Sequence, residues 1–179
     1  MKAFAIDHSR LTYAADFVVY LAAIVLLGGY LLYATPPPAW VTTVAAVAIG
    51  LLSWSLIEYA MHRFVFHGIE PFRRLHAEHH RRPQALIATP TVLSAILVVL
   101  IFFLPATLLG NIWLGGGLTL GVITGYFAYG VTHHAVHHWR PRGAWMRQRK
   151  RLHAIHHHTP DRHYGVTTSI WDRLFGSAG

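Results

Sequence analysis

Four long blocks of apolar residues dominate the chain, and short polar segments separate them. We place the blocks at about residues 17–35, 39–61, 85–109 and 111–132. Each is close to the roughly 20 residues that cross a hydrocarbon core of about 30 Å. If these blocks were buried helices of a soluble protein, too little polar surface would remain to cover them. The pattern therefore predicts an all-α integral membrane protein with four transmembrane helices.

The basic residues are distributed unevenly along this pattern. The links between the first and second blocks, at 35–38, and between the third and fourth, near Gly110, contain no Lys or Arg. All 15 basic residues lie in the N-terminus, the central loop or the C-terminal tail. Because cytoplasmic loops carry an excess of Lys and Arg, we expect both termini and the central loop in the cytoplasm. The chain is then one membrane domain over 1–179, with cytoplasmic segments at 62–84 and 133–179.

The composition of the chain excludes several kinds of site and partner. With 54% hydrophobic and only 12% charged residues, the chain has about half the charged share of an average soluble domain. The formal net charge of +8 can be accommodated by anionic lipid head groups, at about 1 kcal/mol per charge, so a nucleic-acid partner is not expected. Cysteine is absent, which excludes disulfides, thiolate metal sites and a cysteine nucleophile.

Histidine occurs 15 times, and its positions follow the same division. His8 stands alone near the N-terminus, where we expect it to be solvated. The other 14 begin at the end of the second block and lie in the two segments expected in the cytoplasm. They form four groups: His62 and His67; His76, His79 and His80; His133, His134, His137 and His138; and His153, His156 and His157, with His158 and His163 beyond.

Two of these groups are near copies of one another. The pattern Arg-Leu-His-Ala-X-His-His, with Pro three residues later, occurs at 74–83 and again at 151–160. Positions i, i+3 and i+4 share one face of a helix, so each copy is expected to direct three imidazoles toward the same point. The spacing of five between His62 and His67 does not fit one α-helical face, and it suggests that the helix ends between them.

Imidazole at this density suits a first-row transition metal, whereas Mg²⁺ and Ca²⁺ require oxygen ligands. A structural zinc site needs only four ligands, fewer than the chain offers. Ten nitrogens would complete two five-coordinate ions, each with room for an exogenous ligand. A haem protein, a metal store or sensor, and a metal transporter remain alternatives. A transporter would carry His and carboxylates at the membrane midplane, and residues 17–57 and 85–131 contain neither.

The motifs in their order along the chain resemble a known family. They are Glu58-Tyr59-x-x-His62-Arg63-Phe64-x-Phe66-His67, the first His-x-x-His-His, Thr132-His133-x-x-x-His137, the second His-x-x-His-His, and the tail from Tyr164 to Gly176 containing Trp171-Asp172-Arg173-Leu174-Phe175. This order is similar to that of the fatty acid hydroxylase/sterol desaturase superfamily, most closely to its fatty acid 2-hydroxylase branch. The resemblance covers about residues 58–176.

The resemblance implies a dinuclear, nominally di-iron membrane monooxygenase that uses O2 to hydroxylate a lipid, with a fatty acyl chain as the first expectation. Carotenoid hydroxylation and sterol oxidation or desaturation are the alternatives within the same chemistry, and a membrane metal-binding or transport protein is the non-enzyme alternative. The cofactors would be two metal ions, Fe in the native state, with Zn able to replace it on isolation. Electrons would come from a separate cytochrome b5-like or ferredoxin-like protein.

The resemblance also implies ten metal ligands: His62, His67, His76, His79, His80, His133, His137, His153, His156 and His157. His134 and His138 then lie behind the ligands or in the substrate pocket, a choice that rests on Thr132 preceding His133. Glu58 lies four residues before His62 and could accept the proton on its other ring nitrogen, or it could pair with a nearby Arg.

Overall fold

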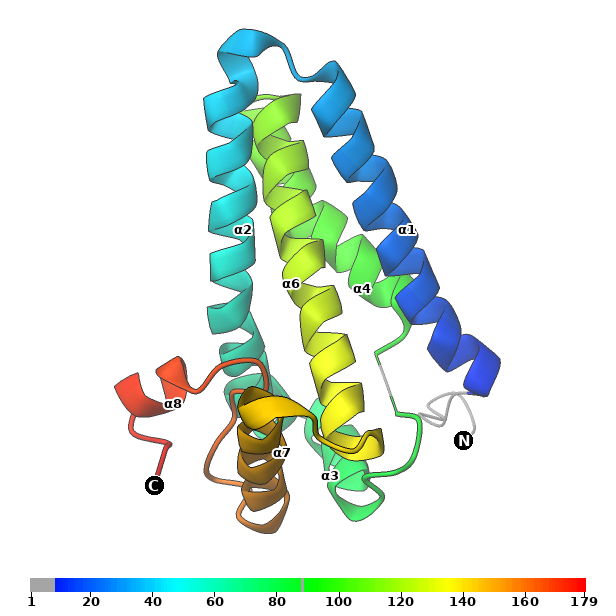
Figure 1. The fold of residues 1–179 in the computed structure, drawn as a ribbon, viewed down its shortest axis with the longest axis vertical. Coiled ribbons are helices and arrows are strands. Elements are labelled where there is room, and N and C mark those ends of the chain that lie inside the picture. The colour runs from blue at the N-terminus through cyan, green and yellow to red at the C-terminus, as the bar shows by residue number, and fades with distance from the viewer. Residues whose placement is uncertain (1–8, 88) are drawn as a thin grey trace. The chain divides into compact units, whose positions relative to one another are not determined.

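The computed structural model describes residues 9–87 and 89–179, and all the elements formed by these residues are helices (Figure 1). His8 lies outside the described residues. The all-α prediction is therefore confirmed. The chain divides into two compact units. Of the described residues, the first unit contains 9–54 and 89–127, and the second contains Ser55–Ile87 and Ala128–Gly179. We call them the membrane unit and the histidine unit.

The helices follow one another with short connections. Their bounds are α1 Arg10–Ala34, η1 Pro37–Ala39, α2 Trp40–Ala60, η2 Met61–Phe66, α3 Phe72–Arg81, α4 Thr91–Val98, η3 Val99–Phe103, α5 Leu104–Leu109, α6 Ile112–His138, α7 Gly143–His158 and α8 Ile170–Leu174. Here η1 is a 3₁₀ helix, whereas η2 and η3 are π-helical turns within longer helices.

Four helical stretches are long and apolar enough to cross a membrane: Arg10–Ala34, Pro37–Phe66, Thr91–Leu109 and Ile112–His138. They correspond to the four predicted spans. The third begins at Thr91 rather than near residue 85, because Pro90 stands at its N-cap. Proline disfavours helical geometry in the residue before it, so a helix that starts after Pro90 avoids that conflict.

The membrane unit exposes many large apolar side chains. Leu26, Leu52 and Leu108 are 72%, 70% and 79% exposed, for example. A water-soluble monomer rarely presents contiguous apolar surface on this scale. Helices whose outer faces are this apolar are suited to lipid, which supports the assignment of the chain as an integral membrane protein.

The glycines of α6 bring its backbone close to that of α2, which lies beside it in Figure 1. A Cβ atom added to Gly121 would lie 2.2 Å from the carbonyl oxygen of Val47, and one added to Gly50 would lie 2.3 Å from the carbonyl oxygen of Leu118. Small residues at such positions allow two membrane helices to pack directly against each other. The atoms nearest to Gly121 are backbone atoms of α2.

We expect Gly121→Val to destabilise the protein strongly, because its side chain would overlap the α2 backbone, which cannot move aside as a side chain can. Overpacking of this kind costs about 1–3 kcal/mol or more. Gly29→Ala is the matched control, because a Cβ atom there would meet nothing within 4 Å. Thermal unfolding in detergent should show a lowered Tm for Gly121→Val and an unchanged or raised Tm for the control. Equal Tm values for Gly121→Val and wild type would show that the helices are not in close contact here.

Candidate metal centre

Nine histidines of the histidine unit converge in two groups. In each group one ring nitrogen per residue lies within 4.8 Å of all the others. Group A contains His62, His67, His76, His80 and His156, and group B contains His79, His133, His137 and His153. All nine are among the histidines singled out in the sequence.

The structure explains how residues five apart reach the same group. The helix ends at Phe66, between His62 and His67, as the sequence suggested. Its last turn is the π-helix η2, and the N–H of His67, at the C-cap, donates to the carbonyl oxygen of His62 at 3.2 Å. The wider π-helical turn brings residues five apart onto one face, and the two ring centres are 5.2 Å apart. The end of the helix was therefore predicted correctly, but its π-helical last turn was not, because the spacing was interpreted with α-helical periodicity throughout.

The two repeated motifs do not each point to a single centre, as the sequence suggested. Helix α3 contributes His76 and His80 to group A but His79 to group B. Helix α7 does the reverse, with His153 in group B and His156 in group A. The physical reason is that neighbouring residues are about 100° apart around an α-helix. The adjacent histidines of each motif can therefore serve two centres side by side.

His157, the tenth predicted ligand, lies next to both groups. Its Nε2 is 3.2 Å from Nε2 of His153 in group B. Its ring also stacks on that of His80 in group A, with ring centres 4.3 Å apart. With His157 counted in group B, the two groups have the same composition: one i, i+4 pair from the repeat on one helix, one histidine from the other repeat, and one pair from the end of a long helix.

The alternative pair on α6 lies elsewhere. His134 and His138 stack on each other with ring centres 4.5 Å apart, and His134 also contacts Trp139. Neither belongs to group A or group B, and the same holds for His158 and His163. Of the two faces of α6 considered from the sequence, the one that carries His133 and His137 is the one that joins His79 and His153.

The spacing of the ring nitrogens fits a shared ion in each group. Nε2 of His76 lies 3.0 Å from Nε2 of both His62 and His80, and Nε2 of His153 lies 2.8 Å from that of His137. Two nitrogens bound about 2.1 Å from one metal and at right angles would be about 3 Å apart. Hydrogen bonding does not account for the His76 contacts, because a neutral imidazole nitrogen can donate to only one of its two neighbours.

His79 gives a second indication. Both of its ring nitrogens are buried, and neither has a hydrogen-bond partner among the described residues. Leaving a buried polar group unsatisfied costs about 1–3 kcal/mol. A metal bound by its lone pair would remove part of that cost. The all-imidazole donor set suits ions such as iron and zinc, so the residues present fit a dimetal site.

Burial keeps these imidazoles in the form that binds metal. It lowers the pKa of His67, His80 and His157 to about 4, and nearby histidines add to the effect. The pKa of His156 falls to about 3, again chiefly through burial. These side chains are therefore neutral at neutral pH. Since a metal binds only the unprotonated nitrogen, no proton has to be displaced before an ion can enter.

Two backbone carbonyls orient ligand candidates of group A. Nδ1 of His62 donates to the carbonyl oxygen of Tyr164 at 2.5 Å, and Nδ1 of His156 donates to that of Arg162 at 2.7 Å. These bonds leave the lone pair on Nε2, which faces the group. Such contacts fix the tautomer and the direction of a metal-binding imidazole. The partner of His62 is thus Tyr164 and not Glu58, the residue suggested by the sequence.

Glu58 acts instead on the loop that supplies these carbonyls. Its Oε1 accepts from the backbone N–H groups of Val166 and Thr167 at 2.7 and 2.9 Å, and its Oε2 accepts from the hydroxyl of Thr167. It is 3% exposed. No feature of the local sequence could have indicated this contact, because the partners are more than 100 positions apart.

Asp172 holds the same loop from the other side. Its carboxylate is fully buried and accepts from the N–H groups of Tyr164 and Gly165 at 2.8 and 3.0 Å. The hydroxyl of Ser177 donates to it at 2.8 Å. Asp172 thus caps backbone N–H groups of this loop. Together, Glu58 and Asp172 form a buried clamp on residues 164–167, which we call the carboxylate clamp.

Comparison with known proteins places this geometry in a family. Residues 47–177 match the fatty acid hydroxylase family. The chain is 35% identical over 147 residues to a dihydroceramide fatty acyl 2-hydroxylase of Arabidopsis thaliana, covering 73% of this chain and 59% of that protein. It is 32% identical over 141 residues to fatty acid 2-hydroxylase of Homo sapiens, covering 71% of this chain and 37% of that protein.

A solved structure has the same fold. Full-length scs7p, in which only the hydroxylase domain is visible, matches with a TM-score of 0.79 at 25% identity, covering 94% of this chain and 67% of that one. The chain spans about half the length of the curated relatives that it matches. Both histidine groups and the carboxylate clamp fall within the matched residues. The chain therefore belongs to the fatty acid hydroxylase family.

Proposed function

We propose that this protein is an O2-dependent hydroxylase that acts on a fatty acyl chain of a membrane lipid. The observation that carries the proposal is the convergence of nine buried or half-buried histidines into two adjacent groups, to both of which α3 and α7 contribute. Its relatives are hydroxylases of fatty acids, dihydroceramide fatty acyl chains and ceramides, which favours an acyl chain over a sterol or carotenoid.

In this proposal each group holds one metal ion, with His157 as the fifth ligand of group B. Iron is the ion we assign to both, since it is the redox-active choice among ions that imidazole binds well. When bound, the two ions supply the activation of O2 with electrons from outside the protein. The chain's own residues hold ten neutral imidazoles in place, fix the tautomers of His62 and His156 through carbonyl groups, and bury His62, His79, His153 and His156 away from water.

We also propose where electrons enter. A pocket of about 310 Å³ reaches His67, His80 and His157, three of the proposed ligands, and Arg73, Ala77, Arg81 and Pro160 complete its lining. Arg73 and Arg81 pair with Glu70 and Glu78, but Arg74 and Arg82 leave residues 70–82 with an excess of positive charge. This excess would attract an acidic partner, because complementary charges steer encounter. A separate cytochrome b5-like or ferredoxin-like donor fits this description. The distribution of basic residues supports a cytoplasmic position for this face.

The proposal is tested by the origin of the oxygen in the product. Membranes that contain the protein, supplied with a reductant and ¹⁸O2, should form hydroxylated acyl chains that carry one ¹⁸O atom. The same membranes with His76→Ala should form none, because that variant removes the central imidazole of group A. Oxygen taken from water, or product that persists in His76→Ala at the wild-type level, would contradict the proposal. Label in sterols or carotenoids instead would redirect the substrate assignment.

A further inference from the structure

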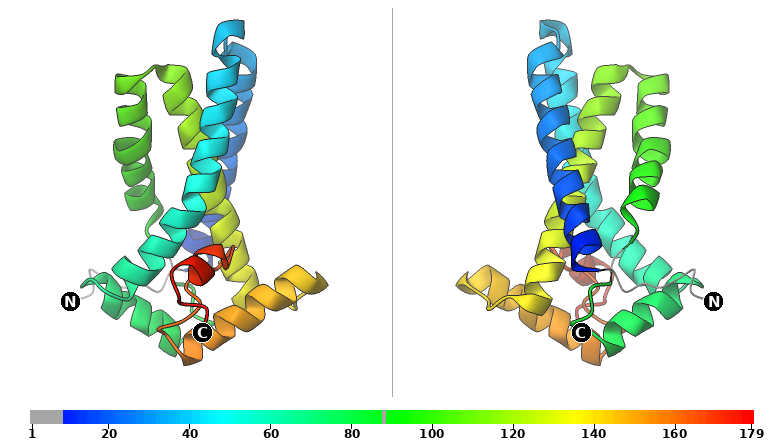
Figure 2. Two further views of the ribbon diagram at one scale, coloured as in Figure 1. Left: turned by 90° about the vertical axis from the view of Figure 1, so that its left-hand side faces the viewer. Right: turned by 90° about the vertical axis from the view of Figure 1, so that its right-hand side faces the viewer.

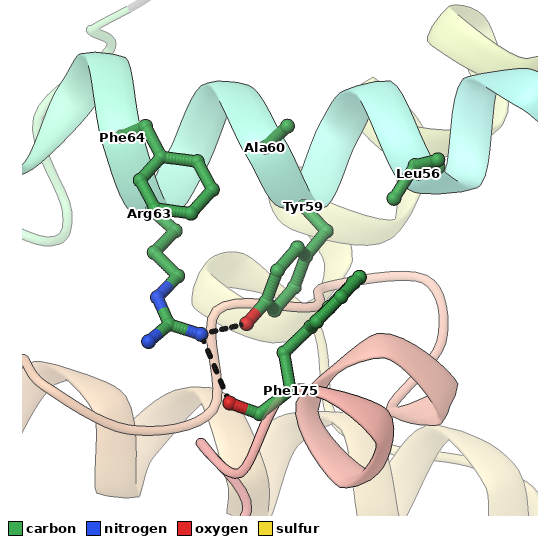
Figure 3. A pocket seen from close by; sticks show the side chains of 6 residues that line it. All are labelled: Leu56, Tyr59, Ala60, Arg63, Phe64 and Phe175. Atoms are coloured by element: carbon green, nitrogen blue, oxygen red, sulfur yellow. Dashed lines mark hydrogen bonds between the residues drawn. The ribbon is translucent and has the colours of Figure 1, made fainter.

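Arg63 borders a surface pocket of the histidine unit that contains none of the proposed metal ligands. The pocket has a volume of about 290 Å³, and its lining is otherwise apolar or aromatic: Leu56, Tyr59, Ala60, Phe64 and Phe175. Figure 3 shows the first four of these side chains and Arg63 on one helix, with Phe175 approaching from the C-terminal segment. A single cation beside an apolar hollow suits an amphipathic anion.

The guanidinium of Arg63 is fixed in place without being neutralised. Its Nη1 donates to the hydroxyl of Tyr59 at 2.5 Å and to the carbonyl oxygen of Phe175 at 3.2 Å, as the dashed lines of Figure 3 indicate. The Cζ atom of Arg63 lies 5.4–5.8 Å from the ring centres of Tyr59, Phe64 and Tyr164. Among the described residues no carboxylate contacts it. Aromatic faces stabilise the cation but leave its charge and its other N–H groups available.

The support behind Arg63 is rigid. The hydroxyl of Tyr59 lies 3.0 Å from that of Ser177, and Ser177 in turn donates to the buried Asp172. The ring of Tyr59 also stacks on Phe175, with centres 5.5 Å apart; Figure 2 shows the C-terminal segment folded against the end of this helix. Arg63 is therefore presented in one orientation, which lowers the entropic cost of binding a ligand.

The position of Arg63 along its helix indicates the source of the anion. It lies 23 residues after Trp40, the first residue of α2, which is about 35 Å at 1.5 Å per residue. A hydrocarbon core is about 30 Å thick, so a helix that enters the core near Trp40 leaves it just before Arg63. At that depth a basic side chain meets lipid phosphate groups. The exposed rings of Phe64 and Phe175, 59% and 51% accessible, would lie against acyl chains.

We propose that this pocket binds an anionic membrane phospholipid, with its phosphate on Arg63 and an acyl chain along Leu56 and Phe64. The free edge of the guanidinium can engage two phosphate oxygens at once, the arrangement that makes arginine selective for such groups. The occupant is a lipid rather than a soluble phosphate because the lining offers apolar surface and only one cation. The site is independent of the hydroxylase proposal, since no proposed metal ligand lines it.

Lipid selectivity in nanodiscs tests the proposal. The protein is reconstituted with phosphatidylcholine and a minor amount of spin-labelled phosphatidylglycerol or spin-labelled phosphatidylcholine, and the motionally restricted fraction of each is measured. The wild type should prefer phosphatidylglycerol, and Arg63→Gln should reduce that preference about fivefold or more. Arg74→Gln is the matched control, because Arg74 is exposed and the substitution removes the same charge. It should behave as wild type.

Two results of this measurement would overturn the proposal. One is an equal loss of preference in Arg63→Gln and Arg74→Gln, which would reduce the effect to the net charge of +8. Another is displacement of the labelled lipid by millimolar inorganic phosphate, which would make the ligand a soluble anion.

A photo-crosslinking phosphatidylglycerol on the wild-type protein gives a second test, which needs no variant to fold. Crosslinks at Leu56, Phe64 or Phe175 support the site, and crosslinks spread over the other basic segments contradict it.

Discussion

His76→Ala and His153→Ala should each reduce the metal content from about two ions per chain to about one, and the double variant should reduce it to near zero. The two residues belong to different groups, and each lies within 3.0 Å of another ring nitrogen of its own group. Loss of either residue should also lower the hydroxylation rate at least about 100-fold. Substitution of residues that only hydrogen-bond to metal ligands already lowers metal affinity or activity by about 10–100-fold. Elemental analysis after gentle detergent purification gives the stoichiometry.

His134→Ala is the matched control for these variants. It removes an imidazole from the same helix as His133 and His137 but from the pair that stacks outside both groups. We expect it to keep two ions. A content of one ion in His134→Ala, with no change in His153→Ala, would move the site to the other face of α6. No metal in a folded wild-type protein would return the transporter and haem alternatives to consideration.

The membrane spans were predictable because a bilayer imposes a simple rule, which is about 20 apolar residues per crossing. That rule is read from local sequence, and it identified all four helical stretches. It could not place the start of the third, because the apolar block runs through Pro90 while the helix begins after it. Lipid compatibility and helix geometry are separate constraints, and only the first is expressed in hydrophobicity.

The identity of the clustered histidines was also predictable, because their type and repetition are visible in the chain. Their division between two groups was not. It depends on the π-helical turn at Met61–Phe66, which sets the direction of His67. It also depends on the packing of α3 and α7, each of which contributes histidines to both groups. A sequence spacing gives the face of one helix, whereas the assignment of that face to a centre depends on which other helices pack there.

The groups that orient the proposed metal ligands were the hardest part of the site to predict from the sequence. The acceptors for His62 and His156 are backbone carbonyls, which every residue possesses and which therefore leave no mark in the sequence. Glu58 was singled out, but the partners considered for it were His62 and a nearby Arg. The contact that it makes, with the N–H groups of Val166 and Thr167, joins distant segments and can be known only from the fold.

The hydrogen bonds that orient the ligands differ between the two groups, and the difference has a chemical consequence. In group A, two imidazoles are oriented by carbonyls of residues 162 and 164. In group B, Nδ1 of His79 and His153, like that of His157 beside them, has no hydrogen-bond partner among the described residues. The carboxylate clamp should therefore govern the affinity of group A while leaving group B largely unaffected.

Asp172→Asn should weaken metal binding at group A by about 10–100-fold. The amide oxygen can replace Oδ1, which serves Tyr164 and Ser177, but its NH₂ group would then face the N–H of Gly165, which now donates to Oδ2. Two buried donors cannot satisfy each other, at a cost of about 1–3 kcal/mol. The loop should shift, and the Tyr164 carbonyl should no longer hold His62 in place.

Stepwise removal of metal with a chelator measures this effect. The wild type should release its two ions slowly. Asp172→Asn should release one ion much faster and the other at the wild-type rate. Glu58→Gln should be milder, because a glutamine oxygen can still accept from Val166 and Thr167 while its NH₂ donates to the Thr167 hydroxyl. Asp161→Asn, at an exposed position of the same segment, is the control and should match wild type. Faster release of both ions in Asp172→Asn would mean that the clamp supports the fold as a whole and has no selective effect on group A.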